Sequence, residues 1–422
     1  MRSFFTNMWC RGLLLSGLAL AAAGSVRADE VTDWHEHMLA ALGTAKVNPI
    51  VSSREAALVS AAVFDAVNGI QRRYAPIHVL SAAPPGASKR AAVVQAACTI
   101  LLARFPAQTN DLNAKRDASL AAIGGSKGNS VQRGLEWGQT VAEGILDWRS
   151  TDGFTPPLPP FFGGLEPGRW RPTPPAFAPG AAPQFATMTP WGILSPDQFR
   201  PLGPPGLDSE QYFVEFEEVR QMGSATSTLR TADETDACLF WASTSGTYVW
   251  NRAAIDLGED RDFGLSENAR LLATLNLAIA DAVISCWDAK YHYAFWRPVT
   301  AIGLADTDGN PETIQDPAWT PLVTTPTFPE YTSGHSSIAG AAATVLADSF
   351  GEDTPFMLES PAVAGWVRFY PNFPTAVDEV ADARVFAGIH FRAACAVGTI
   401  AGSDVAVHIL ENQMRRIHGE DE

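Results

Sequence analysis

Lysine is scarce in this sequence, and negative charge is in excess. The 422 residues include 30 lysines and arginines against 46 aspartates and glutamates, a formal net charge of −16. Such a surface repels nucleic acid and anionic membranes, so neither is an expected partner. Only five of the basic residues are lysines, and Lys290 is the only one that follows Lys127.

Cysteine is also rare, and its spacing excludes the common zinc-binding and redox motifs. Beyond the N-terminal segment the cysteines are Cys98, Cys238, Cys286 and Cys395, with no CxxC pair. An oxidising location would permit disulfides, and four cysteines allow three complete pairings. Buried free thiols remain an equally open interpretation, because all four cysteines lie in apolar helical stretches.

Long hydrophobic runs are absent beyond the first 28 residues. There, Arg2 and Arg11 supply positive charge, an apolar core follows, and Val26-Arg27-Ala28 resembles a small-residue cleavage site. We therefore expect residues 1–28 to be a signal peptide cleaved near Ala28, and the mature protein to be periplasmic or secreted. No later run reaches 18 uncharged apolar residues, so no membrane span is expected in the mature chain.

Sustained alternation of apolar and polar residues is lacking as well, which leaves strands as short additions at most. Apolar residues instead recur three and four positions apart, the period of amphipathic helices. The predicted helices are 53–70, 88–105, 130–149, 207–223, 233–243, 266–296, 336–350, 360–369, 376–390 and 393–416. The 266–296 window is apolar on all sides and predicts a central buried helix. The expected fold class is all-α, built from helical bundles.

Proline is concentrated in one segment. Fifteen of the 30 prolines lie between residues 151 and 205, interleaved with tryptophan and phenylalanine. Proline blocks helices, and aromatic residues argue against a disordered linker, so an ordered segment that wraps over the helices is predicted. This segment divides the mature chain into an N-terminal helical part (29–150) and a C-terminal helical part (206–422).

Three separated motifs carry candidate functional residues. In the first, "CWDAKYHYAFWRPVTAI" (286–302), Lys290 and Arg297 are seven residues apart, which on a helix places both on one face. Pro298 predicts that the helix ends directly behind Arg297. The aromatic surroundings suit unpaired cations poorly, which favours a buried anion site over a solvated face.

The second motif, "FPEYTSGHSS" (328–337), places Ser333, Gly334 and His335 at the start of a helix. Ser333 by itself is typical of a helix cap. The free N–H groups of a helix start, together with a hydroxyl and an imidazole, also suit an anion.

The third motif, "ARVFAGIHFR" (383–392), contains Arg384, Gly388 and His390. On an ideal helix, a six-residue spacing falls about 120° short of two turns, so Arg384 and His390 would flank a pocket, with room beside Gly388. For His390 alone, a hydrogen-bonded core histidine is the plainer interpretation. Together, the three motifs supply three cations, neutral donors and two imidazoles, which fit a tetrahedral oxyanion such as phosphate or vanadate.

In this order, Lys-x6-Arg-Pro, Ser-Gly-His and Arg-x3-Gly-x-His resemble the three-part signature of vanadium-dependent haloperoxidases, whose superfamily includes the type 2 phosphatidic acid phosphatases. The string "WDAKYHYAFWRPVTAI" and the Pro-rich "GRWRPTPPAFAPGAAPQF" (168–185) resemble the exported bacterial branch. The resemblance implies vanadate (orthovanadate) as cofactor, and hydrogen peroxide and halide as substrates. It is also compatible with a homodimer.

The resemblance further implies a role for each matched residue. The vanadate oxygens would be held by Lys290, Arg297, Ser333, the Gly334 N–H and Arg384. His390 would be the axial vanadium ligand, His335 the acid–base residue, and Lys290 a further catalytic cation. Trp287 and Phe328 resemble aromatic positions near the metal, and phenylalanine at 328 resembles the chloride-capable side of the family.

The sequence departs from the family pattern in the third motif. Ala383 and Ala394 stand where a serine and an acid are usual, and in the phosphatases that acid orients the histidine nucleophile. Thr332 replaces a frequent proline in the second motif. Asp378, Asp382 or an acid elsewhere could substitute for the missing acid. An acid that pairs with an arginine of the site is also expected, and Asp233 and Asp236 are the candidates.

Two other activities use the same residues. A phosphoesterase would employ His390 as nucleophile and His335 as the acid that protonates the leaving alcohol. The missing acid at Ala394 places this interpretation second. A binding protein that captures phosphate or vanadate without turnover is the third.

Overall fold

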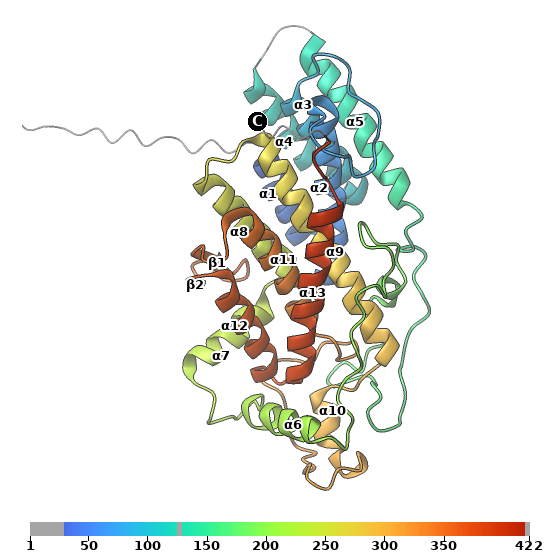
Figure 1. Ribbon diagram of the computed structural model, residues 1–422, viewed down its shortest axis with the longest axis vertical. Helices are drawn as coiled ribbons and strands as arrows, with labels where there is room; N and C mark the ends of the chain where they lie inside the picture. Colours follow the sequence, from blue (N-terminus) through green and yellow to red (C-terminus); the bar gives the residue numbers. More distant parts are fainter. Residues whose placement is uncertain (1–28, 125–128, 418–422) are drawn as a thin grey trace, which may run out of the picture.

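The computed structural model describes residues 29–124 and 129–417, and within these ranges the chain is mainly helical (Figure 1). The expected signal peptide lies outside the described residues. The α-helices are α1 (Glu30–Thr44), α2 (Pro49–Gln71), α3 (Lys89–Arg104), α4 (Thr109–Ile123), α5 (Asn129–Arg149), α6 (Glu210–Met222), α7 (Ala232–Ser243), α8 (Gly246–Asp260), α9 (Leu265–Tyr293), α10 (Pro298–Gly303), α11 (Gly334–Phe350), α12 (Phe373–Phe386) and α13 (Arg392–Asn412). The short 3-10 helices are η1 (Pro106–Gln108), η2 (Pro183–Ala186) and η3 (Ala305–Thr307). The all-α fold class is confirmed.

The helix predicted over 360–369 is wrong, because this window contains the turn and second strand of a β-hairpin. β1 (Phe356–Glu359) pairs antiparallel with β2 (Val367–Tyr370). Phe356 and Leu358 are buried while the residues between and after them are exposed, which is the period of a half-buried strand. Four residues are too few for that alternation to stand out in a sequence. The sequence pattern also does not predict α1, α4, α8 or α10.

α9 is the central buried helix that the 266–296 window predicts. It packs against α2, α11 and α13, and Figure 1 shows it running along the long axis of the molecule. Both α9 and α13 are long and apolar enough to cross a membrane, and 94% and 44% of their respective apolar windows are buried inside the protein. The apolar character of α9 is thus accounted for by its place in the core.

A buried polar network joins α1, α2, α8 and α9 across this core. His35 Nδ1 lies 2.7 Å from the Val31 carbonyl, which can only accept, so Nδ1 carries the ring proton. His35 Nε2 then accepts from the Ser60 hydroxyl at 2.9 Å. Asn276 Nδ2 donates to Ser60 Oγ and to Asn251 Oδ1, and Asn251 donates back. The network therefore requires a neutral imidazole, and burial lowers the pKa of His35 from 6.5 to about 4.

We expect the folded state to lose stability as the pH falls from about 6.5 to about 4. The folded-state pKa of His35 lies below its unfolded value, so the unfolded chain binds the proton first and the contribution disappears on acidification. The full effect is on the order of 3 kcal/mol. Urea unfolding at several pH values should show a steeper loss for the wild type than for His35→Gln. Equal slopes for the two proteins would contradict this assignment.

The Pro-rich segment is ordered and packs along the bundle as predicted. Its anchor is Asp281 of α9, whose carboxylate accepts the N–H groups of Trp191, Gly192 and Ile193 at 2.7–2.9 Å. Arg200 forms a two-point ion pair with Asp288, one turn before the end of α9. The segment is thereby fixed to the helix that carries the first motif.

The described cysteines are free thiols. Cys98, Cys238, Cys286 and Cys395 are all buried, and none is paired. Of the interpretations that the sequence leaves open, the structure selects buried thiols.

Candidate functional site

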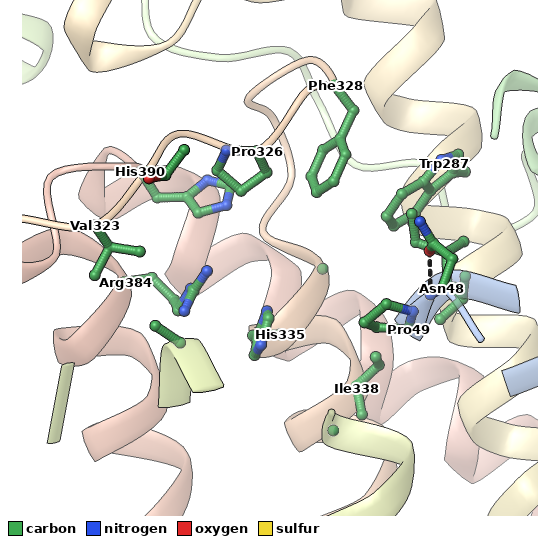
Figure 2. A pocket seen from close by; sticks show the side chains of 16 residues that line it. Asn48, Pro49, Trp287, Val323, Pro326, Phe328, His335, Ile338, Arg384 and His390 are labelled. Atoms are coloured by element: carbon green, nitrogen blue, oxygen red, sulfur yellow. Dashed lines mark hydrogen bonds between the residues drawn. The ribbon is translucent and has the colours of Figure 1, made fainter. Parts of the chain in front are cut away.

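The residues of the three motifs converge on one cavity of about 220 Å³. Its wall is formed by α9, by the start of α11, and by the α12–α13 connection, and the start of α2 closes it from the N-terminal part (Figure 2). Trp287, Phe328, Gly334, His335, Arg384 and His390 line it directly. Lys290, Arg297 and Ser333 lie fully buried behind this surface.

The first motif reaches the site by a different route from the one predicted. α9 ends at Tyr293, Ala294 takes a left-handed conformation (φ 47°), and Arg297 is the N-cap of α10 with Pro298 behind it. Lys290 and Arg297 therefore do not share a helix face, and the single-helix argument is wrong. Both side chains still point at the loop that precedes α11, because the chain turns between them.

The three ammonium protons of Lys290 are taken by backbone carbonyls of that loop. Nζ lies 3.0 Å from both the Pro329 and Glu330 oxygens and also contacts the Thr332 oxygen. Burial lowers the pKa of Lys290 to about 8. In this arrangement Lys290 fixes the loop and adds positive potential, and it would contact an anion directly only by releasing a carbonyl.

Arg297 is held by the same loop and by the α12–α13 connection. Its Nε donates to the Phe328 carbonyl at 2.9 Å, and Nη1 donates to the Ile389 carbonyl at 2.6 Å. Nη2 is buried and finds no partner among the described residues. Burial lowers the pKa of this guanidinium to about 9.

Arg384 and His390 also differ from the predicted geometry, because they are not on one helix. Arg384 is in the last turn of α12, which ends at Phe386, and His390 belongs to the connection before α13. They face the cavity side by side, as Figure 2 shows. Arg384 makes one long bond, from Nη1 to the Trp241 carbonyl at 3.4 Å, and its buried Nε has no partner within the described ranges. Burial lowers its pKa to about 10.

The sequence predicts that Gly388 leaves room for a ligand, and this is wrong. The missing side chain instead leaves room for neighbouring parts of the protein. Gly388 adopts φ +80°, and a Cβ there would lie 2.5 Å from the Gly223 carbonyl oxygen and 2.8 Å from Pro321 Cβ. Glycine is thus required both by the left-handed backbone and by the close approach.

Gly388→Ala is expected to lower the free energy of unfolding by about 2–4 kcal/mol and to shift His390. Gly309→Ala is the matched control, because Gly309 also has φ +80° but its added Cβ would meet nothing within 4 Å. The free energy of unfolding of the control should fall only by the cost of placing alanine in the left-handed conformation, about 1–2 kcal/mol. Denaturant unfolding of both variants tests this, and equal losses would contradict the close-approach argument.

His390 presents a lone pair at Nε2. Arg297 Nη1, which can only donate, lies 3.2 Å from Nε2, so Nε2 must be the unprotonated nitrogen. The proton is on Nδ1, which donates to Glu330 Oε1 at 2.8 Å. Burial lowers the pKa of His390 well below its ordinary value, so the ring is neutral. Such a ring can serve as a metal ligand or a nucleophile.

Glu330 is the functional residue that sequence reasoning missed. Its side chain is completely buried, and Oε1 also accepts the Phe391 N–H at 2.9 Å. Burial raises the pKa of this carboxyl to about 8. Glu330 fixes the tautomer and orientation of His390, which is the work expected of an acid at position 394. Glu330 lies within "FPEYTSGH", shortly before His335. This closeness to a candidate catalytic residue is the sequence feature that could have identified it.

The acids named from the sequence do not reach the site. Asp233 and Asp236 pair with Arg368, and Asp382 pairs with Arg392. Asp378 lines a separate cavity. The hypothesis that one of them compensates for Ala394 or pairs with a cation of the site is wrong, since Glu330 occupies that position.

The second motif is both a helix cap and a wall of the cavity. Ser333 is the N-cap of α11 and accepts from the Ser336 N–H at 3.4 Å and the Ser336 hydroxyl at 3.0 Å. His335 follows in the first turn, and its Nε2 is shielded from solvent without a partner in the described part of the chain. Burial and the neighbouring Arg384 keep the pKa of His335 well below its ordinary value.

Trp287 and Phe328 form an aromatic corner over the cations. Their ring centroids are 5.0 Å apart, and Lys290 Nζ and Arg297 Cζ lie 5.0 Å and 4.9 Å from the Phe328 ring. Trp287 Nε1 donates to the Ala181 carbonyl of the Pro-rich segment at 3.2 Å. That segment supports the aromatic corner from behind and does not line the cavity.

The donor set fits an oxyanion and not a bare metal cation. Three buried cations and two neutral imidazoles surround the cavity, and Arg297 Nη2, Arg384 Nε and His335 Nε2 are polar atoms in want of partners. Residues 29–124 and 129–417 contain no group of three His, Cys, Asp or Glu side chains placed to hold a metal ion. An anion with several oxygens would satisfy the unpartnered donors.

Comparison with known proteins points to one family. Residues 270–419 match the family described as "VCPO second helical-bundle domain". The vanadium chloroperoxidase of Curvularia inaequalis is 32% identical over 171 residues, and the match spans 33% of this chain and 27% of that relative, about a quarter of its length. A bacterial vanadium-dependent iodoperoxidase superposes with a TM-score of 0.81 at 26% identity, covering 93% of this chain and 98% of the other. A bacterial vanadium-dependent chloroperoxidase shares the fold, with a TM-score of 0.71 at 16% identity over 86% of this chain and 94% of the other.

Proposed function

We propose that this chain, which belongs to the vanadium-dependent haloperoxidase family, holds vanadate and oxidises halide with hydrogen peroxide to hypohalous acid. One observation carries the proposal. The unprotonated His390 Nε2, which accepts from Arg297 Nη1 at 3.2 Å, belongs to a residue that lines the cavity, and buried cationic N–H groups beside it have no partner among the described residues. A multiply charged oxyanion with a ligand-accepting centre satisfies both.

The residues divide into those that would hold vanadate and those that position the holders. His390 Nε2 would be the metal ligand, and Arg297, Arg384, Ser333 and the Gly334 N–H would hold the oxygens. Lys290 lies behind the residues that line the cavity and adds positive potential. Glu330 keeps the His390 proton on Nδ1. Vanadate, when bound, supplies a Lewis-acidic centre that activates peroxide without changing its own oxidation state.

His335 is suited to move the proton of hydrogen peroxide. Its ring lines the cavity, and its lowered pKa keeps it neutral and able to accept. Burial and Arg384 lower the pKa of this ring, and backbone hydrogen bonding at Thr244 and Trp241 opposes them by favouring the protonated form. The cationic side chains are buried, and charges in such surroundings interact more strongly with an anion than charges in water do.

A phosphoesterase is the second candidate, and the Glu330–His390 pair favours it. A buried carboxyl group that orients a neutral histidine is the arrangement needed for an attacking imidazole, with His335 as the acid for the leaving alcohol. The objection drawn from Ala394 is removed, because Glu330 performs the orienting role. Vanadate separates the candidates, since it would activate a haloperoxidase and inhibit a phosphoesterase.

The test follows halogenation of a cyclic β-diketone reporter by the purified protein with peroxide and bromide, chloride or iodide. The protein is first freed of bound anions in phosphate-free buffer, and each reaction is run with and without orthovanadate. Halogenation that depends on vanadate, peroxide and halide is expected. No halogenation with any halide, in a folded protein that binds vanadate, would overturn the proposal.

A further inference from the structure

A second cavity adjoins the oxyanion cavity and has a different lining. It has a volume of about 270 Å³ and shares the residues Pro49 and Ala242 with its neighbour. Its polar lining comes mainly from residues 243–247, which span the end of α7, the short connection and the start of α8. The same connection presents the Thr244 carbonyl to His335 in the first cavity. The two cavities therefore adjoin at Pro49 and Ala242.

The start of α8 lies at this cavity without a side-chain cap. Ser245 occupies the N-cap position but makes no capping hydrogen bond. The first N–H groups of any helix have no partner within the helix, and they carry a partial positive charge. α8 is 15 residues long, so its dipole is fully developed at this end.

Three hydroxyls beside this helix start, those of Thr244, Ser245 and Thr247, are shielded and have no partner among the described residues, and the two threonines are the more deeply buried. Thr244 and Thr247 line the cavity, their exposed fractions are 5% and 1%, and neither Oγ1 atom has a hydrogen-bond partner among the described residues. A buried hydroxyl without a partner costs free energy unless a ligand or water satisfies it. Both threonine hydroxyls can donate to an anion.

Among the residues that line the cavity, the charge has one sign. Lys46 is the charged lining residue, and its side chain is exposed. No aspartate or glutamate is among the lining residues. This is unusual surface for a chain with a formal net charge of −16, whose overall field repels anions.

We propose that this cavity binds a single halide ion and serves as an antechamber to the oxyanion cavity. The inference rests on the proposed function, because a halide site would supply the anionic substrate of that reaction to a protein with negative net charge. Apart from Ser52 and Tyr248, the remaining lining is apolar and includes Leu39, Leu42 and Val47, which suits a large, weakly hydrated ion. A phosphate-like anion would require more cations than Lys46 provides.

The direct test is diffraction from crystals of the vanadate-free protein soaked in bromide, with the anomalous signal of bromine as readout. A bromide peak between the Thr244 and Thr247 hydroxyls and the start of α8 is expected. It should be absent from the double variant Thr244→Val/Thr247→Val, which keeps the side-chain shape. Water alone in the cavity at saturating bromide, or a peak that persists in the double variant, would overturn the proposal. Weak occupancy on exposed surfaces only would identify an adventitious ion only and would also overturn it.

The kinetic test uses the vanadate-loaded protein. The KM for bromide should rise between about tenfold and a hundredfold in the double variant, because two hydrogen bonds to a charged ligand are lost. Its KM for peroxide should stay unchanged. Lys46→Gln, at an exposed position that does not endanger folding, should raise the same KM in the same direction. An unchanged KM for bromide in all variants would count against an antechamber.

Thr399→Val is the matched control. Thr399 of α13 also has a shielded hydroxyl without a partner in the described residues. This residue lines a different cavity, which shares no lining residue with the proposed halide site. Its substitution should leave bromide binding and the KM for bromide as in the wild type. Bromide binding by the vanadate-free protein is independent of turnover. A bromide peak without halogenation would therefore refute the proposed function and leave the halide site standing, and halogenation without the peak would refute the site alone.

Discussion

His335→Gln is expected to lower the turnover number for halide oxidation by about 10²- to 10⁴-fold, the range of a lost acid–base group. Glutamine preserves much of the size and polarity of the side chain but cannot exchange a proton near neutral pH. His335 lines the cavity with a shielded, unpartnered Nε2, and its low pKa keeps it neutral before the reaction. Vanadate affinity should change little, because His390 and the arginines remain. Steady-state kinetics with bromide and peroxide measures the first quantity and equilibrium dialysis the second.

The control for this prediction is His408→Gln. His408 lies on α13 and contacts Phe199 and Asn412, away from the cavity. It should retain the wild-type turnover number. A His335→Gln protein that binds vanadate and turns over at the wild-type rate would show that another group moves the proton.

Arg384→Met is expected to weaken vanadate binding between about tenfold and a hundredfold. Arg384 reaches the cavity with one long hydrogen bond and an unpartnered Nε, so few of its donors are engaged before the anion arrives. Methionine keeps an extended side chain but removes the charge and the donors. Equilibrium dialysis of vanadate against the anion-free protein gives the ratio of dissociation constants.

Arg392→Met makes the same change of charge at a site eight residues further on. Arg392 is paired with Glu218 and Asp382 at the start of α13 and does not line the cavity. Its effect on vanadate affinity should stay within about threefold, as expected for a screened charge. Equal losses in the two variants would mean that Arg384 acts through the overall field and not by contact.

The sequence motifs identify the right residues for partly wrong geometric reasons. Lys290 and Arg297 come together because α9 ends at Tyr293 and the chain turns, not because two helical turns separate them. Arg384 and His390 both face the cavity because α12 ends between them. Chain reversals of this kind depend on tertiary packing, such as the contact between Gly388 and Gly223, which no local period encodes.

Glu330 illustrates a different limit of prediction from the sequence. Its role depends on a contact with His390, 60 residues further along the chain, and a single glutamate in a loop has no periodic signal. The β-hairpin shows a third limit, because the buried pair Phe356 and Leu358 is too short a pattern to distinguish from a helical turn. In contrast, α9 was predictable because its 29 residues are apolar on every side and only a buried helix satisfies that pattern.

The most direct test of the account is a titration of the anion-free protein with orthovanadate, recording bromination of the reporter and hydrolysis of p-nitrophenyl phosphate at each point. The account predicts that bromination is absent at the start and rises to a plateau at one vanadate per chain, while any hydrolysis falls. Hydrolysis that is rapid without vanadate and is suppressed by it, with no bromination at saturation, would contradict the account and identify a phosphoesterase.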